Sequence, residues 1–349
     1  MPVIVIIKTM QLMDILFILI GIGIVLRGAD NLTEGAVSVA RKFHMPELVI
    51  GLTIVAFGTS MPELCVSMAS AVSGTSDMAV GNVVGSNIFN VLLVVGVCAA
   101  IHPMSVEMST IRRDLPFAFI ATLLLIFFLS DGTMSRWEGL LMVVLFSLYV
   151  WYMLRSVRHA PEISSETSGS TTKAGGNNPE QGENSANADA QDGKLRRTVK
   201  RLRACSPLLI VLGLAELVFG ADVFVGAATR LAQSMGISEA VIGITILGAG
   251  TSLPELATSV VAACKGSTSM ALGNVIGSCV FNIMLILGLT SVIMPLSPSG
   301  ITTVDLAMLF ASALALYIFS VTNKTMERWE GVVLTLGFIG YMVWLVMNV

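Results

Sequence analysis

The sequence predicts an all-α membrane protein of ten transmembrane helices, built as two inverted-topology five-helix repeats with broken helices. Three observations support this class. Hydrophobic residues make up 54% of the 349-residue chain and charged residues 12%, whereas soluble domains typically carry about 25% charged residues. Apolar segments recur at close to the roughly 20-residue length that a membrane helix needs. Finally, motifs of the first half return in the second half at a constant offset of 192 residues.

The transmembrane segments can be placed in order along the first half. Apolar runs lie around residues 12–26, 80–100, 115–129 and 140–154, and the second half carries their counterparts. A further apolar run around Gly58 is interrupted by proline, which brings the total to about five spans per half by the length rule. The first run has no basic start and no small-residue cleavage site, so it is predicted to be a retained helix and not a signal peptide.

The two halves are predicted to lie in opposite orientations. Five spans separate equivalent points, and because five is odd, the second half must enter the membrane the other way round. Basic residues gather in cytoplasmic loops, and this rule is met when the N-terminus and the C-terminus both lie outside. The outer side then holds Lys8, Arg136 and Arg230, and the inner side holds Arg27, Arg41, Lys42, Arg112, Arg113, Lys265, Lys324 and Arg328.

A polar segment separates the repeats. The chain is therefore divided into a first transmembrane repeat (1–158), a disordered cytoplasmic linker (159–204) and a second, inverted transmembrane repeat (205–349). The linker is rich in Ser, Thr, Gly, Asn, Glu and Gln and has too few apolar side chains to bury a core. Basic residues flank it, and such clusters beside a membrane attract anionic lipid head groups. We expect contact with the lipid bilayer and none with nucleic acid, while the oligomeric state stays open.

The most informative motif is a duplicated acidic break within an apolar run. Residues 58–64 read GTSMPEL, and residues 250–256 read GTSLPEL. Proline has no N–H and its ring clashes with the preceding turn, so Pro62 and Pro254 are predicted to interrupt their helices and free backbone carbonyls. Irregular backbone at membrane depth is tolerated where protein or a water-filled cavity surrounds it. One copy would be explained by a simple proline kink, whereas two copies at equivalent positions favour a site.

The breaks place acidic side chains where a cation would need ligands. A glutamate in mid-membrane is costly and is a functional hypothesis by default, and Glu63 recurs as Glu255. Hydroxyl groups within one turn of them would add the all-oxygen shell that calcium and sodium prefer. No HExxH motif or histidine lies beside the breaks, so an enzyme is not expected and no cofactor is implied. The hydroxyl groups belong to Thr59, Ser60, Thr251 and Ser252.

A second duplicated motif follows each break. Residues 81–90 read GNVVGSNIFN, and residues 273–282 read GNVIGSCVFN. Together the two motifs resemble the repeats of the sodium/calcium exchanger family, in the cation/calcium antiporter superfamily, over nearly the whole chain outside the linker. The resemblance implies a secondary active antiporter that exchanges sodium for calcium by alternating access at a midplane two-glutamate site. The lack of a calcium-sensing domain suits a prokaryotic member in the plasma or inner membrane.

The resemblance also implies roles for individual residues. Glu63 and Glu255 would be the central ligands shared by calcium and sodium. The backbone carbonyls of Ala56 and Gly248, seven residues before each glutamate, match positions that hold outer sodium ions in the family. The remaining matched metal ligands are the side chains of Thr59, Ser60, Ser86, Asn90, Thr251, Ser252, Ser278 and Asn282.

Three positions depart from the pattern or have no role in it. Many members carry aspartate at the position of Asn282, and its absence here argues against potassium co-transport. Cys279 stands where the first half has Asn87, and nothing in the sequence explains the thiol. Glu216 lies inside an apolar run, and its first-half counterpart is Ile24.

Two other functions stay open at this point. The main alternative is a proton/calcium antiporter, although proton-coupled relatives use a different acidic motif. A cation channel would also use carbonyls and glutamates, but conduction needs no opposed copies of a broken helix. The ion affinity, stoichiometry and direction of transport are not encoded in any motif of the chain.

Overall fold

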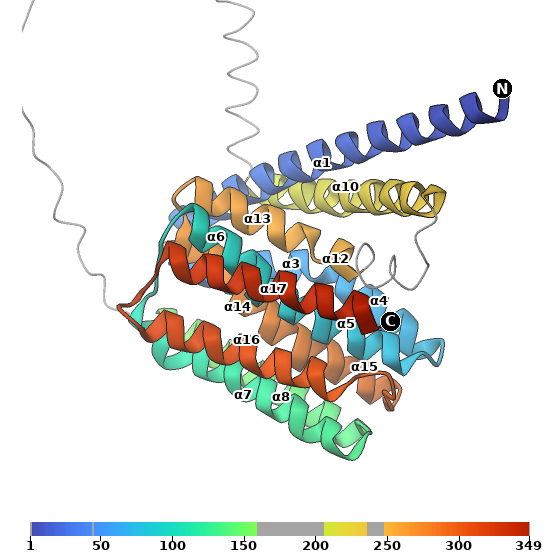
Figure 1. The fold of residues 1–349 in the computed structure, drawn as a ribbon. Coiled ribbons are helices and arrows are strands. Elements are labelled where there is room, and N and C mark those ends of the chain that lie inside the picture. Colours follow the sequence, from blue (N-terminus) through green and yellow to red (C-terminus); the bar gives the residue numbers. More distant parts are fainter. Residues whose placement is uncertain (1, 44, 159–205, 236–247, 349) are drawn as a thin grey trace, which may run out of the picture.

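The structure, a computed structural model, describes residues 2–43, 45–158, 206–235 and 248–348. The linker predicted at 159–204 therefore lies outside the described residues. Almost all of the described chain is helical (Figure 1). The first half contains α1 (Pro2–Lys42), α2 (Glu47–Ile50), η1 (Gly51–Val55), α3 (Ala56–Thr59), α4 (Met61–Val72), α5 (Ser76–Ile88), η2 (Phe89–Val95), α6 (Gly96–Ile101), β1 (Met104–Ser105), η3 (Thr110–Asp114), α7 (Leu115–Phe128), η4 (Leu129–Asp131) and α8 (Arg136–Arg158). The second half contains α10 (Ser206–Ser234), α12 (Gly248–Thr251), α13 (Leu253–Cys264), α14 (Thr268–Val280), η6 (Phe281–Leu287), α15 (Gly288–Ile293), α16 (Thr303–Val321), β2 (Thr325–Met326) and α17 (Arg328–Asn348).

The helices are long and apolar enough for a membrane protein. Within the described residues, eight helices pass this test, and the bent pair Glu47–Thr59 and Met61–Val72 makes a ninth span. The tenth expected span would join Gly248–Cys264 to residues 236–247, which lie outside the described part, so the count of ten stays a prediction. The first span runs without interruption over Gln11–Lys42. Arg27, expected in an inner loop, therefore lies within α1, and that expectation was wrong.

Contacts between the halves occur in matched pairs, as a two-fold relation between inverted repeats requires. Met104 pairs with Met326 in the ribbon of β1 and β2. The residues at the equivalent positions, Leu296 and Met134, form an isolated bridge of their own. The helices pair in the same reciprocal way. In the first half α8 packs on α15 of the second half, and in the second half α17 packs on α6 of the first half. The repeat seen in the sequence is therefore also a repeat of the tertiary contacts.

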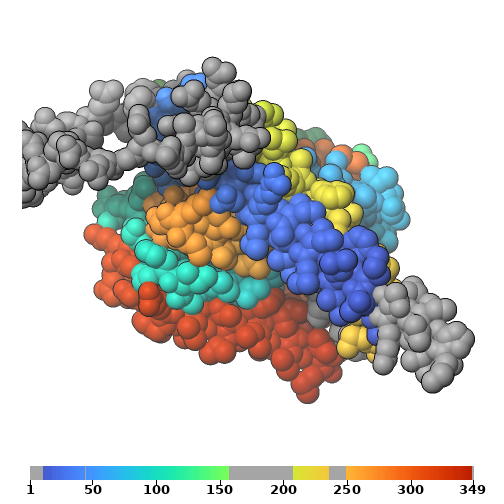
Figure 2. Space-filling model, turned by 90° about the horizontal axis from the view of Figure 1, so that it is seen from above, coloured from blue at the N-terminus to red at the C-terminus, as the bar shows by residue number. Residues whose placement is uncertain are grey.

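The first helices of the two halves, α1 and α10, form a separate layer. They lie side by side along one edge of the molecule (Figure 1). Figure 2 shows α1 next to α13, with α6 and then α17 beyond it. Gly28 and Gly213 lie where the two helices approach closely, since an added Cβ would come within 2.7 Å and 2.5 Å of the other helix's backbone. Small residues of this kind allow close helix packing in membranes.

Polar contacts also hold α1 against α10. Glu216 accepts a 2.6 Å hydrogen bond from Asn31 and forms a 3.3 Å ion pair with Arg27. Nearer the other end of the pair, Arg230 lies 2.9 Å from Asp14. Glu216, which had no assigned role, is thus a partner of α1 on the packed face of α10.

Acidic residues at the ends of the spans cap the N-termini of helices. Glu138 accepts hydrogen bonds of 2.7 Å from the backbone N–H and the hydroxyl of Ser135 at the start of α8. Glu330 accepts a 2.7 Å bond from the Glu327 N–H at the start of α17. Asp305 and Thr302 form a reciprocal capping box before α16. Such caps satisfy N–H groups that have no partner inside the helix.

We predict that Gly331→Ala lowers the stability of the protein. A Cβ at Gly331 would lie 2.5 Å from the Gly96 carbonyl oxygen and 2.6 Å from the Ala100 nitrogen, so α17 and α6 would have to separate. Overpacking of this kind costs about 1–3 kcal/mol. Thermal unfolding of the purified protein in detergent should show a lower melting temperature. Gly337→Ala on the same helix is the control, because no described atom lies within 4 Å of its added Cβ, and equal melting temperatures would contradict the prediction.

Candidate ion-binding site

Each broken helix is interrupted at a single serine. Ser60 separates α3 from α4 with φ −86° and ψ 8°, and Ser252 separates α12 from α13 with φ −92° and ψ 6°. Pro62 and Pro254 follow near the start of the new helix, where the missing N–H costs no intrahelical hydrogen bond. The first broken span bends by 45°. The predicted interruption of both helices is confirmed, with nearly identical backbone geometry in the two halves.

The breaks place both glutamates at the N-terminus of a helix. Glu63 lies in the first turn of α4 and Glu255 in the first turn of α13. Both residues are 0% exposed. The N-terminus of a helix carries partial positive charge, which stabilises a nearby carboxylate. Sequence reasoning emphasised freed carbonyls and missed this second effect, although proline followed directly by glutamate is a signal for a helix start.

The two glutamates are held by serines from opposite halves. The Ser60 hydroxyl donates to Glu255 Oε1 at 2.8 Å, and the Ser252 hydroxyl donates to Glu63 Oε1 at 3.0 Å. Ser278 on α14 adds a longer contact of 3.4 Å to the same Glu255 oxygen. Because each carboxylate reaches the break of the other helix, both lie at one place between the repeats.

Several buried polar atoms around the breaks have no hydrogen-bond partner among the described residues. A buried polar group without a partner is costly and calls for an explanation such as an ion. Nowhere in the described ranges do three His, Cys, Asp or Glu side chains gather, so a cation here would take two carboxylates and neutral oxygens. Calcium accepts this mixture of oxygen ligands. The unpartnered atoms include Glu63 Oε2, Glu255 Oε2, Ser86 Oγ, Asn282 Oδ1 and both polar atoms of the Asn90 amide.

The two asparagines of the site lie in π-helical segments. Asn90 is in η2 and Asn282 is in η6, and both are 0% exposed. The η2 segment packs against α13, and η6 packs against α4, so each asparagine lies on an element that contacts the glutamate-bearing helix of the other half. Short π-helical segments within α-helices are frequent at functional sites. Nothing in the residue pattern predicted them.

A second pair of asparagines, Asn82 and Asn274, lies beside the breaks, and their side-chain amides are already engaged in hydrogen bonds. Asn82 donates to the Glu63 carbonyl at 3.2 Å and to Ser67 Oγ at 3.0 Å. Its counterpart Asn274 donates to Ser259 Oγ at 2.9 Å. Their side-chain oxygens accept from threonines of the opposite half, at 3.4 Å for Asn82 and 3.3 Å for Asn274. Helix-to-helix bonding therefore accounts for both amides.

The remaining sequence-predicted ligands differ in what surrounds them. Thr59 is buried and directs its hydroxyl to the Val55 carbonyl at 3.1 Å and to Asn274. Thr251 is half-buried and contacts Asn82. The Ala56 carbonyl accepts the Ser60 N–H at 3.0 Å and a longer contact of 3.4 Å from the Thr59 hydroxyl. Gly248 begins α12, directly after residues outside the described part.

A cavity of about 600 Å³ reaches this region from one side. Asn82 and Thr251 are among its described lining residues, together with Asp77, Asp305 and Tyr341. The cavity is large enough to hold many waters. Water in this cavity would therefore contact Asn82 and Thr251.

A scan against protein-family models identifies the chain in both halves. The model of the sodium/calcium exchanger protein family matches residues 13–155 and 205–347. Among curated proteins, the putative antiporter CaxA of Alkalimonas amylolytica is 36% identical over 95% of this chain and 98% of its own length. The sodium/calcium exchanger MaX1 of Methanosarcina acetivorans is 36% identical over 95% and 97%, respectively. The inner membrane protein YrbG of Escherichia coli is 32% identical over 95% of each chain.

Solved structures give the same result at the level of the fold. A structure of the sodium-calcium exchanger NCX_Mj, soaked with Na⁺ and Ca²⁺, matches with a TM-score of 0.76 at 27% sequence identity, over 95% of this chain and 98% of that one. The residues that the family model matches include both broken helices and the positions of Glu63 and Glu255. On these grounds the chain is a multi-pass membrane protein of the sodium/calcium exchanger family and a cation/calcium antiporter, not an enzyme.

Proposed function

We propose that this protein exchanges sodium for calcium by alternating access, with both ions using the site between Glu63 and Glu255. The observation that carries the proposal is the reciprocal contact of each glutamate with the serine of the opposite break, at 2.8 Å and 3.0 Å. This contact occupies one oxygen of each carboxylate and leaves the other buried and unpartnered among the described residues. Two free carboxylate oxygens at one place form a cation site.

The charge of the site provides the coupling. Asn90 and Asn282 are neutral, so the two carboxylates carry about two negative charges, which one calcium ion neutralises. An empty ionised pair would be costly to move through the low-dielectric interior. The carrier is therefore expected to change its open side only when loaded, with calcium in one direction and sodium in the other. The remaining ligands would come from the hydroxyl oxygens of Thr59, Ser60, Ser86, Thr251, Ser252 and Ser278, the amide oxygens of Asn90 and Asn282, and the backbone carbonyls of Ala56 and Gly248.

The membrane orientation is part of the proposal. Both termini would lie outside, and the central segment with its basic flanks would lie in the cytoplasm, where anionic lipid attracts such residues. One relative is named an inner membrane protein, and the plasma or inner membrane is proposed here as well. The division into a first repeat (1–158), a linker (159–204) and a second, inverted repeat (205–349) is proposed together with this orientation.

Proton coupling is the second candidate. Two carboxylates with neutral amides beside them can be neutralised by two protons as well as by one calcium ion, and this residue set favours no particular counter-ion. The relatives also include a putative antiporter whose name states no ion. The motif GTSxPE nevertheless resembles sodium-coupled members, so sodium is preferred.

Sodium should drive calcium uptake in a reconstituted system. Proteoliposomes loaded with sodium and diluted into sodium-free medium with radiolabelled calcium are expected to accumulate calcium, because outward sodium movement supplies the free energy. Liposomes loaded with potassium, with no pH difference, should show only background uptake. Uptake driven equally well by a pH gradient without sodium would replace the proposal by proton/calcium antiport, and uptake without any counter-ion gradient would indicate a channel.

Removing either site carboxylate should abolish exchange. Glu63→Gln and Glu255→Gln each halve the negative charge, and uptake is expected to fall by more than about 100-fold, beyond the 10–100-fold typical of residues that only orient a ligand. Glu138→Gln is the matched control, because Glu138 caps α8 and glutamine keeps an acceptor oxygen. Normal uptake by Glu63→Gln would contradict the proposed site.

Exchange should carry a net current if three sodium ions replace one calcium ion. Three sodium ions leave about one positive charge on the two-carboxylate site, and moving one elementary charge through 100 mV involves roughly 2.3 kcal/mol. Recording on a solid-supported membrane is expected to show a transient current on adding calcium, absent in Glu255→Gln. Full uptake without current would require two sodium ions per calcium.

A further inference from the structure

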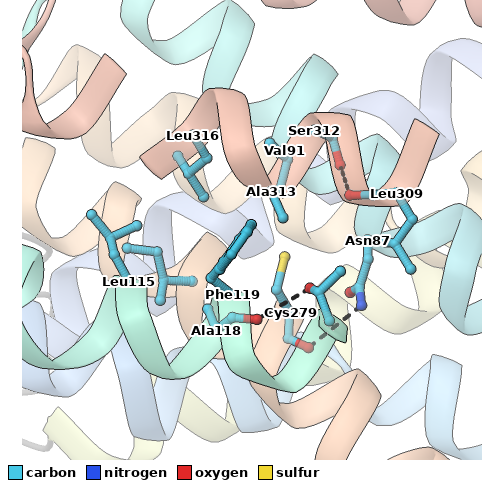
Figure 3. A pocket seen from close by; sticks show the side chains of 12 residues that line it. Asn87, Val91, Leu115, Ala118, Phe119, Cys279, Leu309, Ser312, Ala313 and Leu316 are labelled. Atoms are coloured by element: carbon cyan, nitrogen blue, oxygen red, sulfur yellow. Dashed lines mark hydrogen bonds between the residues drawn. The ribbon is translucent and has the colours of Figure 1, made fainter. Parts of the chain in front are cut away.

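A chain of amide hydrogen bonds connects the backbone of α14 to Asn282. Asn87 on α5 is 1% exposed, and its Nδ2 donates to the Cys279 carbonyl oxygen at 3.5 Å. Asn87 Oδ1 accepts from Asn282 Nδ2 at 3.3 Å. Figure 3 shows the Asn87 amide directed at the Cys279 carbonyl, while the Cys279 sulfur points to the opposite side. Both bonds are long, but they occur in series and within a buried region.

The chemistry of the carbonyl sets the direction of this series. A backbone carbonyl accepts and cannot donate, so Asn87 must turn its NH₂ group toward Cys279. The Asn87 oxygen then faces Asn282, which must present its own NH₂ group. Asn282 Oδ1 takes no part in this series, and it is buried without a hydrogen-bond partner among the described residues. An oxygen held in this way is oriented to accept a cation, and the NH₂ group is kept away from it.

The first half cannot form the equivalent series. The counterpart of Asn282 is Asn90, and the residue at the position equivalent to Asn87 is Cys279. A thiol is a weak donor and a weak acceptor, and it has no carbonyl oxygen to receive an amide. In agreement, neither Nδ2 nor Oδ1 of Asn90 has a partner in the described part of the chain. The two asparagines therefore differ in their support although their positions are equivalent.

We propose that Asn87 is a positioning residue that keeps the Asn282 oxygen directed at the transported cation, and that Cys279 leaves the Asn90 amide free to turn. This inference rests on the proposed function, because it requires that both asparagines face the ion. Asn282 is then a preorganised ligand, whereas Asn90 loses rotational freedom when a cation binds, which weakens binding. A free amide can also turn its NH₂ group toward the carboxylates when the site is empty. Cys279 thereby makes one ligand adaptable.

The site of Cys279 has room for the substitution that tests this. A cavity of about 20 Å³ lies beside it, lined also by Asn87, Thr122 and Ser312 (Figure 3). This volume exceeds what one water molecule needs. Asparagine is only slightly larger than cysteine, so Cys279→Asn should fit without forcing α14 from its neighbours.

The test measures calcium binding by isothermal titration calorimetry to the purified full-length protein, with calcium uptake as the second measurement. Asn87→Cys is expected to weaken calcium binding about 10-fold, the scale on which loss of an orienting partner acts at metal sites. The double variant Asn87→Cys with Cys279→Asn, the exchanged pair, would orient Asn90 instead of Asn282. It is expected to restore most of the calcium affinity. Cys279→Asn alone should bind calcium more tightly than the wild type, because both asparagines are then oriented. Transport by these variants should change in KM more than in the maximal rate.

Controls separate this inference from the function on which it rests. Ser312→Ala alters the same small cavity without touching the amides and should bind calcium like the wild type. Melting temperatures of the variants show whether they fold, and if Asn87→Cys does not, Cys279→Asn alone decides. No gain with that variant, or no recovery in the folded exchanged pair, would overturn the role of Asn87 and Cys279. In contrast, absent calcium binding by the wild type, or normal binding by Glu63→Gln, would overturn the proposed function itself.

Discussion

The burial of two carboxylates at one place, each hydrogen-bonded to a serine from the opposite half, is the constraint on which the other features depend. Glu63 and Glu255 are fully buried, and an unpaired charge in a low-dielectric interior is very costly. The hydroxyls of Ser252 and Ser60 reduce this cost for one oxygen of each carboxylate. A cation can satisfy the others. The site is therefore stable only where both breaks meet, which requires the inverted packing of the two repeats.

The broken helices serve this constraint in two ways. Each break exposes a helix N-terminus whose partial positive charge faces the glutamate of its own helix. It also turns the serine that ends one helix toward the other half. Around the breaks, Asn82 and Asn274 connect the facing helices by hydrogen bonds, and close glycine contacts such as Gly331 with Gly96 hold the outer helices. The residues proposed to bind the ion thus lie on closely packed helices, and α1 and α10 form their own layer beside them.

Much of this architecture was predictable from the sequence because it depends on residue identity at a fixed offset. Composition indicates the membrane, and the repeated GTSxPEL motif indicates both breaks and the two glutamates beside them. The cross-contacts between Ser60 and Glu255 were not predictable, because a repeat does not state which residues of its two copies touch. The π-helical segments around Asn90 and Asn282 were also missed, since π-helical and α-helical turns have the same apolar pattern.

Two residues illustrate the limit of a one-dimensional pattern. Arg27 was placed in a loop by its charge, yet it lies within α1 and pairs with Glu216. Asn87 had no predicted role, because its hydrogen-bond partner is the carbonyl of Cys279 in the other half. In both cases the partner comes from the opposite repeat, about half of the chain away. Contacts of this kind appear only when the two halves are packed together.

The reciprocal serine contacts also bear on how such a chain could arise. A single half inserted alone would hold a buried glutamate with no serine to receive it, and a serine with no glutamate. Two identical half-chains could complete each other only if one entered the bilayer in each direction. Fusion of two such halves fixes that opposed pair in one polypeptide, after which positions such as 87 and 279 are free to diverge.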